Sequence, residues 1–122
     1  MSESMTQGAP EPYSSTELKA RFFRVLGDPV RMGILELLLE GEKNVSEIVS
    51  RLGMSQSRVS NHLACLRWCG LVSVRRKGSF IYYSLADEQL RELLEIANDR
   101  VEHFARSLAS CGKLDGEGVP SY

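Results

Sequence analysis

Hydrophobic residues recur at helical spacing through the first 70 residues of this 122-residue chain. The pattern predicts four consecutive helices between about residue 15 and residue 70. The expected boundaries are cap and turn residues, namely Gly27, Asp28-Pro29, Gly41, Gly53-Met54, Ser55 and Gly70. The third and fourth helices, over residues 45–52 and 55–70, are joined by a tight turn with glycine. This arrangement is typical of a helix-turn-helix.

After residue 70 the pattern changes. Two runs rich in β-branched and aromatic residues, 71–76 and 79–85, surround Lys77-Gly78 and predict a β-hairpin. Asp87 then predicts the cap of a long last helix. Its apolar residues form one broad stripe: Leu90, Leu93, Leu94, Ile96, Ala97, Val101, Phe104, Ala105 and Leu108. This stripe is wide enough to face both its own domain and a second chain.

The resulting element order is α-α-α-α-β-β-α, which is a mainly α winged helix-turn-helix with the hairpin as its wing. We expect one domain over residues 15–110, a disordered tail at 1–14 and a loose tail at 111–122. No apolar run approaches the roughly 18 residues of a membrane span. The N-terminus has no apolar signal core, so a cytoplasmic location without membrane contact is expected.

The distribution of charge is more informative than the net charge of −1. The segment 48–86 carries no carboxylate, whereas the segments on both sides of it are acidic. Its six bases are Arg51, Arg58, Arg67, Arg75, Arg76 and Lys77. A basic stretch of this length in an acidic protein is typical of a phosphate-facing surface.

Double-stranded operator DNA is therefore the expected partner. At about 100° per residue, small polar residues of the fourth helix lie opposite its apolar edge. The residues expected to reach base edges or phosphates are Gln56, Ser57, Ser60 and Asn61. Backbone contacts, which set affinity rather than sequence preference, are expected from Arg58, Arg75, Arg76 and Lys77.

The three cysteines are Cys65, Cys69 and Cys111. An odd number of thiols does not suggest a secreted disulfide framework. Cys65 and Cys69 are four residues apart in the fourth helix, on a flank between its core and DNA-reading faces. Thiolates select soft metals, and with Cys111 the pair would form a three-sulfur site suited to Cd(II), Pb(II), Hg(II) or As(III). The plainer interpretation is three unreactive cysteines.

Several strings occur in a specific order, and together they resemble the ArsR–SmtB family of metal-responsive repressors over residues 16–110. The strings are Asp28-Pro29-Val30-Arg31, residues 55–63, Leu66-Arg67, Gly70-Leu71-Val72 and Tyr82-Tyr83-Ser84-Leu85. The run from His62 to Val72 is similar to the cadmium- and lead-sensing type of that family. Trp68 departs from the pattern, which has a small residue there.

The resemblance implies a homodimer formed through the first and last helices. It implies a repressor that binds DNA without metal and is released when Cd(II) or Pb(II) binds Cys65, Cys69 and Cys111. Two other metal positions of the family look empty. No cysteine lies near residues 45–48, and Asp99, Glu102 and His103 lack the spacing of the site on the last helix.

Other interpretations stay open at this point. Hg(II) or As(III) is an alternative effector, and Cys111 belongs to the site either within one chain or across two. A redox-responsive repressor of the same fold, switched by a disulfide, is the alternative function. A constitutive DNA-binding protein with inert thiols is another. An enzyme is not expected, because the sequence has no nucleophile–base set and no phosphate loop.

Overall fold

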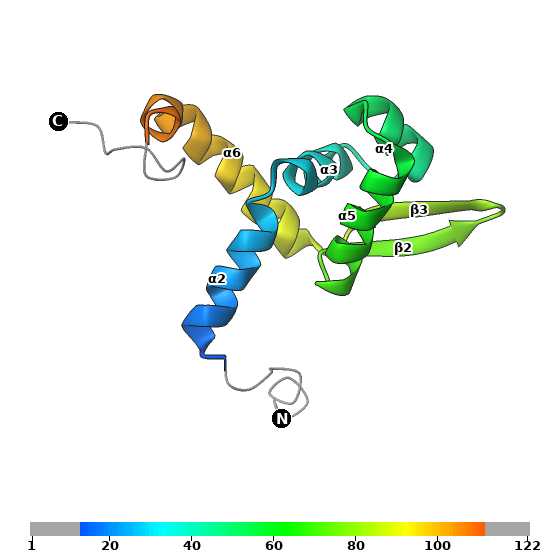
Figure 1. Cartoon of the computed structure of the whole chain (residues 1–122), viewed down its shortest axis with the longest axis horizontal. Coiled ribbons are helices and arrows are strands. Elements are labelled where there is room, and N and C mark those ends of the chain that lie inside the picture. Colours follow the sequence, from blue (N-terminus) through cyan, green and yellow to red (C-terminus); the bar gives the residue numbers. More distant parts are fainter. Residues whose placement is uncertain (1–12, 112–122) are drawn as a thin grey trace. The chain divides into compact units, whose positions relative to one another are not determined.

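The computed structural model describes residues 13–111 (Figure 1). Along the sequence, the chain divides between Leu85 and Ala86 into two compact units. The helices of the first unit are α2 (Ser15–Leu26), α3 (Pro29–Leu39), α4 (Val45–Leu52) and α5 (Gln56–Trp68). Its strands are β1 (Lys43–Asn44), β2 (Val72–Lys77) and β3 (Phe80–Leu85). The second unit contains α6 (Glu88–Ala109). Most of both expected tails, residues 1–12 and 112–122, lies outside the described residues.

The helices begin where the sequence predicts. Asp28 precedes α3, and its carboxylate accepts hydrogen bonds from the backbone N–H groups of Val30 at 2.8 Å and Arg31 at 3.0 Å. Ser55 caps α5 and Asp87 caps α6 in the same way. Each cap satisfies N–H groups that have no partner within the helix, which is why a short polar residue at these positions starts a helix.

The core of the first unit lies among α3, α4 and α5. Ile34 and Leu35 of α3, Ile48 of α4 and Val59 of α5 are all 0% exposed. Helix α3 is apolar on almost every side because it packs against α2, α4, α5 and β3. Large-to-small changes in such a core cost about 2–5 kcal/mol each, so the relative placement of α4 and α5 is strongly determined.

Helices α4 and α5 form the helix-turn-helix, and β2 and β3 form an antiparallel hairpin beside it (Figure 1). Gly53 ends α4 at φ +67°, a left-handed conformation that side-chain-bearing residues rarely adopt. One further strand pairs with the hairpin, and the sequence pattern does not predict it. Strand β1 pairs with β3, with Lys43 opposite Tyr83, and gives the sheet order β1-β3-β2. With only two residues, β1 is too short to show an alternating pattern.

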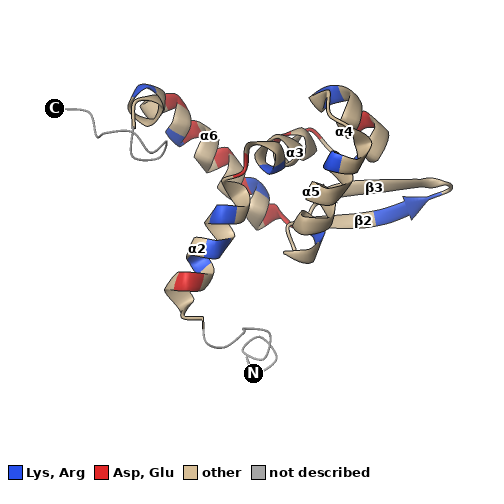
Figure 2. Ribbon diagram, viewed as in Figure 1, with Lys and Arg blue, Asp and Glu red and all other residues tan. Residues whose placement is uncertain are grey.

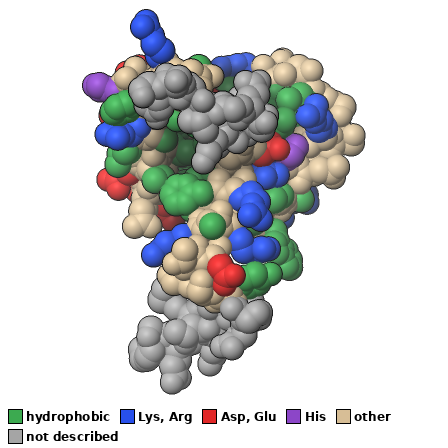
Figure 3. Space-filling view, turned by 60° about the vertical axis from the view of Figure 1, so that its left-hand side comes forward, with side chains coloured by type: hydrophobic (Ala, Val, Ile, Leu, Met, Phe, Trp, Pro, Cys, Tyr) green, Lys and Arg blue, Asp and Glu red, His purple; other side chains and the backbone are tan. Residues whose placement is uncertain are grey.

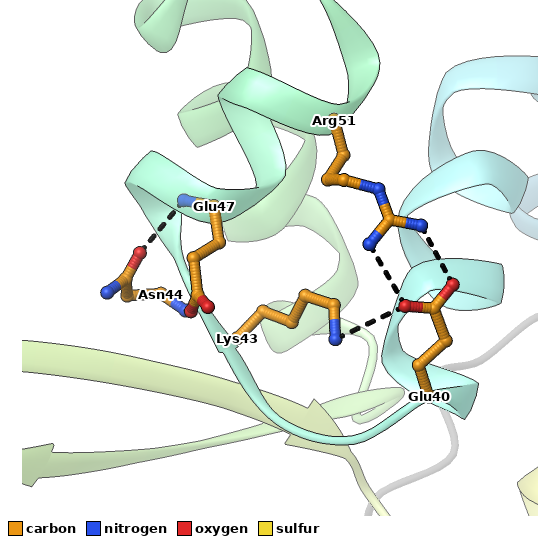
Figure 4. Close-up of polar contacts among 5 residues, drawn as sticks. All are labelled: Glu40, Lys43, Asn44, Glu47 and Arg51. Carbon is orange, nitrogen blue, oxygen red and sulfur yellow. Dashed lines mark hydrogen bonds and ion pairs between the residues drawn. The ribbon is translucent and has the colours of Figure 1, made fainter.

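Polar contacts hold the first helix of the motif to the preceding turn (Figure 4). Asn44 and Glu47 form a capping box, in which each side chain accepts a hydrogen bond from the other residue's backbone N–H at 2.9 Å. Arg51 donates two hydrogen bonds to the Glu40 carboxylate at 3.0 and 2.9 Å, and Lys43 lies 3.5 Å from the same carboxylate. Arg51 is therefore paired and does not present a free charge.

In the second unit, only Leu90 and Leu94 of the apolar stripe of α6 are buried. Four large apolar side chains between Ile96 and Leu108 are 45–58% exposed. The helix is kinked at Phe104, whose φ of −120° and ψ of 19° are not helical. None of the helices between residues 13 and 111 is long and apolar enough to cross a bilayer.

The Asp28 cap generates a pH-dependent prediction. The hydrogen bond from the backbone N–H of Arg31 is the main cause that holds the pKa of Asp28 below 3.8. A carboxyl group whose pKa is lowered on folding stabilises the fold above its unfolded pKa, and this contribution is lost as the pH falls through the folded pKa. We expect D28A to lower the free energy of unfolding by about 1 kcal/mol at pH 7, and this difference to narrow towards pH 3.

Urea unfolding at fixed protein concentration, at pH 7, 5 and 3, measures this difference. D28N is the control, because asparagine caps helices about as well as aspartate but does not titrate. A D28A deficit that is the same at pH 3 as at pH 7 would contradict the assignment.

Candidate functional site

Helix α5 has one buried edge and one exposed face. Val59, Leu63 and Leu66 are at most 1% exposed. The five residues predicted to contact DNA from this helix are all exposed: Gln56, Ser57, Arg58, Ser60 and Asn61. The structure therefore places these polar side chains together on the outer face of the second helix of the motif, near its N-terminus. An exposed polar face in this position suits entry into the major groove.

The wing presents three bases from one strand. Arg75, Arg76 and Lys77 are consecutive in β2 and exposed, opposite Tyr82, Ile81 and Phe80 of β3. Figure 2 shows Lys and Arg, and no acid, on this hairpin. Phe80 is 55% exposed and Ile81 40% exposed, so the tip of the wing is apolar as well as basic.

Arg75 is not free, however. Its guanidinium forms a two-point ion pair with Glu42, in which Nε donates to Oε2 at 2.8 Å and Nη2 donates to Oε1. The guanidinium also lies 5.6 Å from the centre of the Tyr82 ring. Hydrogen bonding to Arg75 is the main cause that lowers the pKa of Glu42. In the protein without DNA, Glu42 is therefore paired with Arg75, which the sequence predicts to contact a DNA phosphate.

The two thiols of α5 lie one helical turn apart at the end of the helix. Cys69 caps the helix, and its backbone N–H donates to the carbonyl oxygen of Cys65 at 2.9 Å. Gly70, at φ +78°, then turns the chain: its N–H donates to the carbonyl oxygen of Arg67 at 3.0 Å, and the N–H of Leu71 donates to the carbonyl oxygen of Leu66 at 2.9 Å. This pair of reversed bonds is a glycine-based helix stop. It fixes the thiols on the last turn of the helix.

The electrostatics of the pair depend on the two thiols and two arginines. Burial of the side chain raises the pKa of Cys69, and so do the charge of Cys65 and the hydrogen bond between the thiols. The positive charges of Arg31 and Arg21 lower it. The residue as a whole is exposed, but its side chain lines a cavity beside α2, so partial burial of the sulfur accounts for the direction. The two thiols therefore contact each other.

Cys111 belongs to the second unit, where it follows the cap of α6 and is half-buried. Its N–H donates to the carbonyl oxygen of Leu108 at 3.3 Å. Within one chain, no three His, Cys, Asp or Glu side chains between residues 13 and 111 gather into a group that could hold a metal. The thiol contact that the structure describes is the one between Cys65 and Cys69, within the first unit.

Three charged partners in these sites are not apparent from the sequence. Glu42 is 33 residues from Arg75, and only the pairing of β1 with β3 places it beside the wing. Arg21 and Arg31 lie in α2 and α3, far along the chain from Cys69. No local motif marks any of the three, because each depends on contacts between distant segments.

The comparisons with known proteins identify the family. The model of the "bacterial regulatory protein, arsR family" matches residues 28–74, from α3 into β2. Over 110 residues the chain is 41% identical to a probable mercury resistance operon repressor of Streptomyces lividans, a match that covers 90% of this chain and 88% of that relative. The chain belongs to the arsR family. As the sequence predicts, it is a DNA-binding transcriptional repressor and not an enzyme.

A second relative is named for cadmium rather than mercury. The transcriptional regulator CmtR of Mycobacterium tuberculosis is 45% identical over 75 residues, 62% of this chain and 64% of CmtR. The solved structure of CmtR, a cadmium metal sensor, matches 60% of this chain and 75% of that chain with a TM-score of 0.54.

Two further solved structures are more similar overall. Rv0081 of M. tuberculosis has a TM-score of 0.73 and 37% identity, over 82% of this chain and 99% of that chain. A homodimeric winged helix-turn-helix DNA-binding domain from Mycobacterium bovis has a TM-score of 0.66 and 30% identity, over 78% and 90%. These matches confirm the winged helix-turn-helix fold.

The contact between the thiols can be tested without any metal. In a chain that carries C111S, we expect C65A to lower the pKa of Cys69, because the substitution removes both contributions of Cys65 that raise it. The thiolate absorbance in the ultraviolet, followed against pH, measures this. C65S is the matched control, since serine keeps a hydrogen-bonding group and removes only the charge. An unchanged titration of Cys69 in C65A would show that the thiols do not interact.

Proposed function

We propose that this arsR-family protein is a homodimeric repressor that binds operator DNA when metal-free and is released when a thiophilic metal binds Cys65, Cys69 and Cys111. The observation that carries the proposal is the pair of adjacent thiols on the last turn of the helix that presents the polar DNA-reading face. One helix then takes part in both DNA binding and metal binding.

The donor set fits a soft ion. Two thiolates separated by one helical turn can bind one soft metal. We assign the third sulfur to Cys111. Cd(II) and Pb(II) are the proposed effectors, with Hg(II) and As(III) as alternatives. Support comes from the donor chemistry and from relatives that are named as a cadmium sensor and a mercury resistance operon repressor.

The apolar surface of the chain supports a dimer through α2 and α6. Only Leu26 of α2 is buried, and Phe23 is 56% exposed. The exposed stripe of α6 includes Ile96, Val101 and Leu108, at 58%, 50% and 49%. Hydrophobic side chains are visible on the surface drawn in Figure 3. A second copy of the chain would bury these side chains, and a two-fold dimer would present two reading helices to two half-sites.

Metal binding and DNA binding are coupled through the position of α5. An effector releases DNA only if it binds the DNA-free conformation more tightly, and such coupling is typically about 5- to 150-fold in affinity. Residues Gln56, Ser57, Arg58, Ser60 and Asn61, with the wing bases Arg75, Arg76 and Lys77, are the proposed DNA contacts. A metal bound at the last turn of α5 would shift the helix or hold it in one position. The five proposed DNA contacts on α5 would then be displaced relative to the DNA bases.

Release of DNA by metal is the decisive test. A duplex selected from a random-sequence pool by the metal-free protein serves as the DNA, and fluorescence anisotropy measures its affinity. We expect Cd(II) or Pb(II) to weaken binding by about 5- to 150-fold. C65S, C69S and C111S should bind the duplex like the parent but lose the response. Failure of all four metals to release DNA, or a parent-like response of C65S, would overturn the proposal.

The same assay separates the redox alternative, which the contact between the Cys65 and Cys69 thiols favours over inert cysteines. Release of DNA by peroxide in the presence of a chelator, with reversal by a dithiol, would indicate disulfide formation in place of metal binding. Neither metal nor peroxide would release DNA from a constitutive binder.

The ion pair between Arg75 and Glu42 generates a prediction about DNA affinity. If Arg75 contacts phosphate, Glu42 competes with DNA for it. We expect E42Q to raise the affinity of the metal-free protein about two- to fivefold, since an exposed ion pair is worth little more. The dependence of log affinity on log salt should steepen by up to about 1.

E36Q is the matched control, because it removes the same charge from an exposed residue of α3. Adding R75Q to E42Q should return the affinity to the parental value or below. An equal gain in E36Q would mean that only net charge matters, and no gain in E42Q would mean that Arg75 does not contact DNA.

A further inference from the structure

A cavity of about 400 Å³ lies beside the last turn of α5, between α2 and the first turn of α3. Its lining combines apolar side chains of α2 with positive charge and the thiol of Cys69. Three arginines line it, Arg21, Arg24 and Arg31, and none of its lining residues is an acid. The proposed function uses the thiol of Cys69 but gives no role to the arginines around it.

Arg31 is held in place by the backbone. Its Nε donates to the carbonyl oxygen of Val25 at 2.8 Å and its Nη2 to that of Arg24 at 3.5 Å, so the guanidinium is fixed at the junction of α2 and α3. The residue is half-buried, and its charge acts on Asp28, whose carboxylate already caps α3. The positive charge of Arg31 is thus only partly compensated.

Arg21 is exposed and is the more accessible of the two for a test. Its guanidinium lies 4.7 Å from the centre of the Tyr13 ring, and none of the ion pairs among residues 13–111 includes it. Both arginines lie near enough to Cys69 to stabilise negative charge on its sulfur. Two positively charged neighbours favour a bound group whose complex with the thiols carries negative charge.

We propose that Arg21 and Arg31 form a charge-compensating wall of the thiol site and favour effectors whose thiolate complexes carry a net negative charge. The inference rests on the proposed function, and it selects among the effectors that the thiols alone do not distinguish. A divalent ion that binds three thiols displaces three protons to solvent and leaves a complex of charge −1. Arsenous acid, As(OH)₃, condenses with three thiols, releases three waters and leaves a neutral complex.

Because only the first product is an anion, the arginines stabilise bound Cd(II) or Pb(II) and have little effect on bound As(III). In water, two unit charges a few ångströms apart interact by an amount that is small but measurable in binding constants. The contribution should therefore appear as a difference in selectivity between two ions at the same cysteines. A loss of both affinities together would instead indicate structural damage.

The experiment compares Cd(II) with As(III) in the full-length protein, using the ultraviolet charge-transfer absorbance of the metal–thiolate bonds with competing chelators or dithiols. We expect R21Q to weaken Cd(II) binding about three- to fivefold and R21E to weaken it more. R21K keeps the positive charge and should bind Cd(II) like the parent. Binding of As(III) should change by less than twofold in all three. K19Q is the matched control, because Lys19 is exposed on the same helix and does not line the cavity.

Equal weakening of Cd(II) and As(III) in R21Q would overturn the inference, as would an effect of K19Q as large as that of R21Q or unchanged Cd(II) binding in R21E. The oligomeric state and the DNA affinity of each metal-free variant should match the parent. If the parent binds neither ion through its cysteines, the proposed function fails and this inference fails with it. Parental binding that R21Q does not alter overturns the inference alone.

Discussion

Burial of Val59, Leu63 and Leu66 is the constraint on which both candidate sites depend. These three side chains fix the rotation of α5 about its own axis, because each successive residue of a helix turns the face by about 100°. A rotation by one residue would expose this edge and turn either Ser60 and Arg67 or Arg58 and His62 into the apolar core without partners, which is costly. The polar face and the thiol flank are therefore set by the same packing, and neither site needs its own positioning element.

The position of the thiols along α5 limits how a bound ion can act. At about 1.5 Å per residue, Cys65 and Cys69 lie roughly 12–18 Å along the axis from Ser57. An ion there is too far away to block contacts between the N-terminal end of the helix and DNA directly. In the proposed repressor, coupling would pass through movement of the whole helix or of the dimer, and the core that packs against α5 would transmit such movement because a packed core deforms little.

The sequence predicts local features of this fold well and distant contacts poorly. Asp28, Ser55 and Asp87 were identifiable as caps because the physical reason for a cap lies within four residues. Strand β1, the pair of Glu42 with Arg75 and the arginines beside Cys69 depend on segments that meet only in the folded chain. No proline or glycine lies near Phe104 in the sequence, so the kink there could not be predicted. For the candidate sites, the sequence therefore supplies the groups proposed to contact DNA and metal, and the structure adds the charged residues that lie beside them.

Those charges change the meaning of the acid-free stretch from residue 48 to residue 86. Two of its six bases, Arg51 and Arg75, are paired with Glu40 and Glu42, which lie just outside the stretch. The positive surface available to DNA in the free protein is smaller than the sequence suggests. Conversely, Arg21 and Arg31 come from a net-acidic segment and lie beside the thiol of Cys69. Folding thus divides the positive charge between the surface proposed to contact DNA and the cavity that Cys69 lines, and the division depends on tertiary contacts rather than on where bases cluster in the sequence.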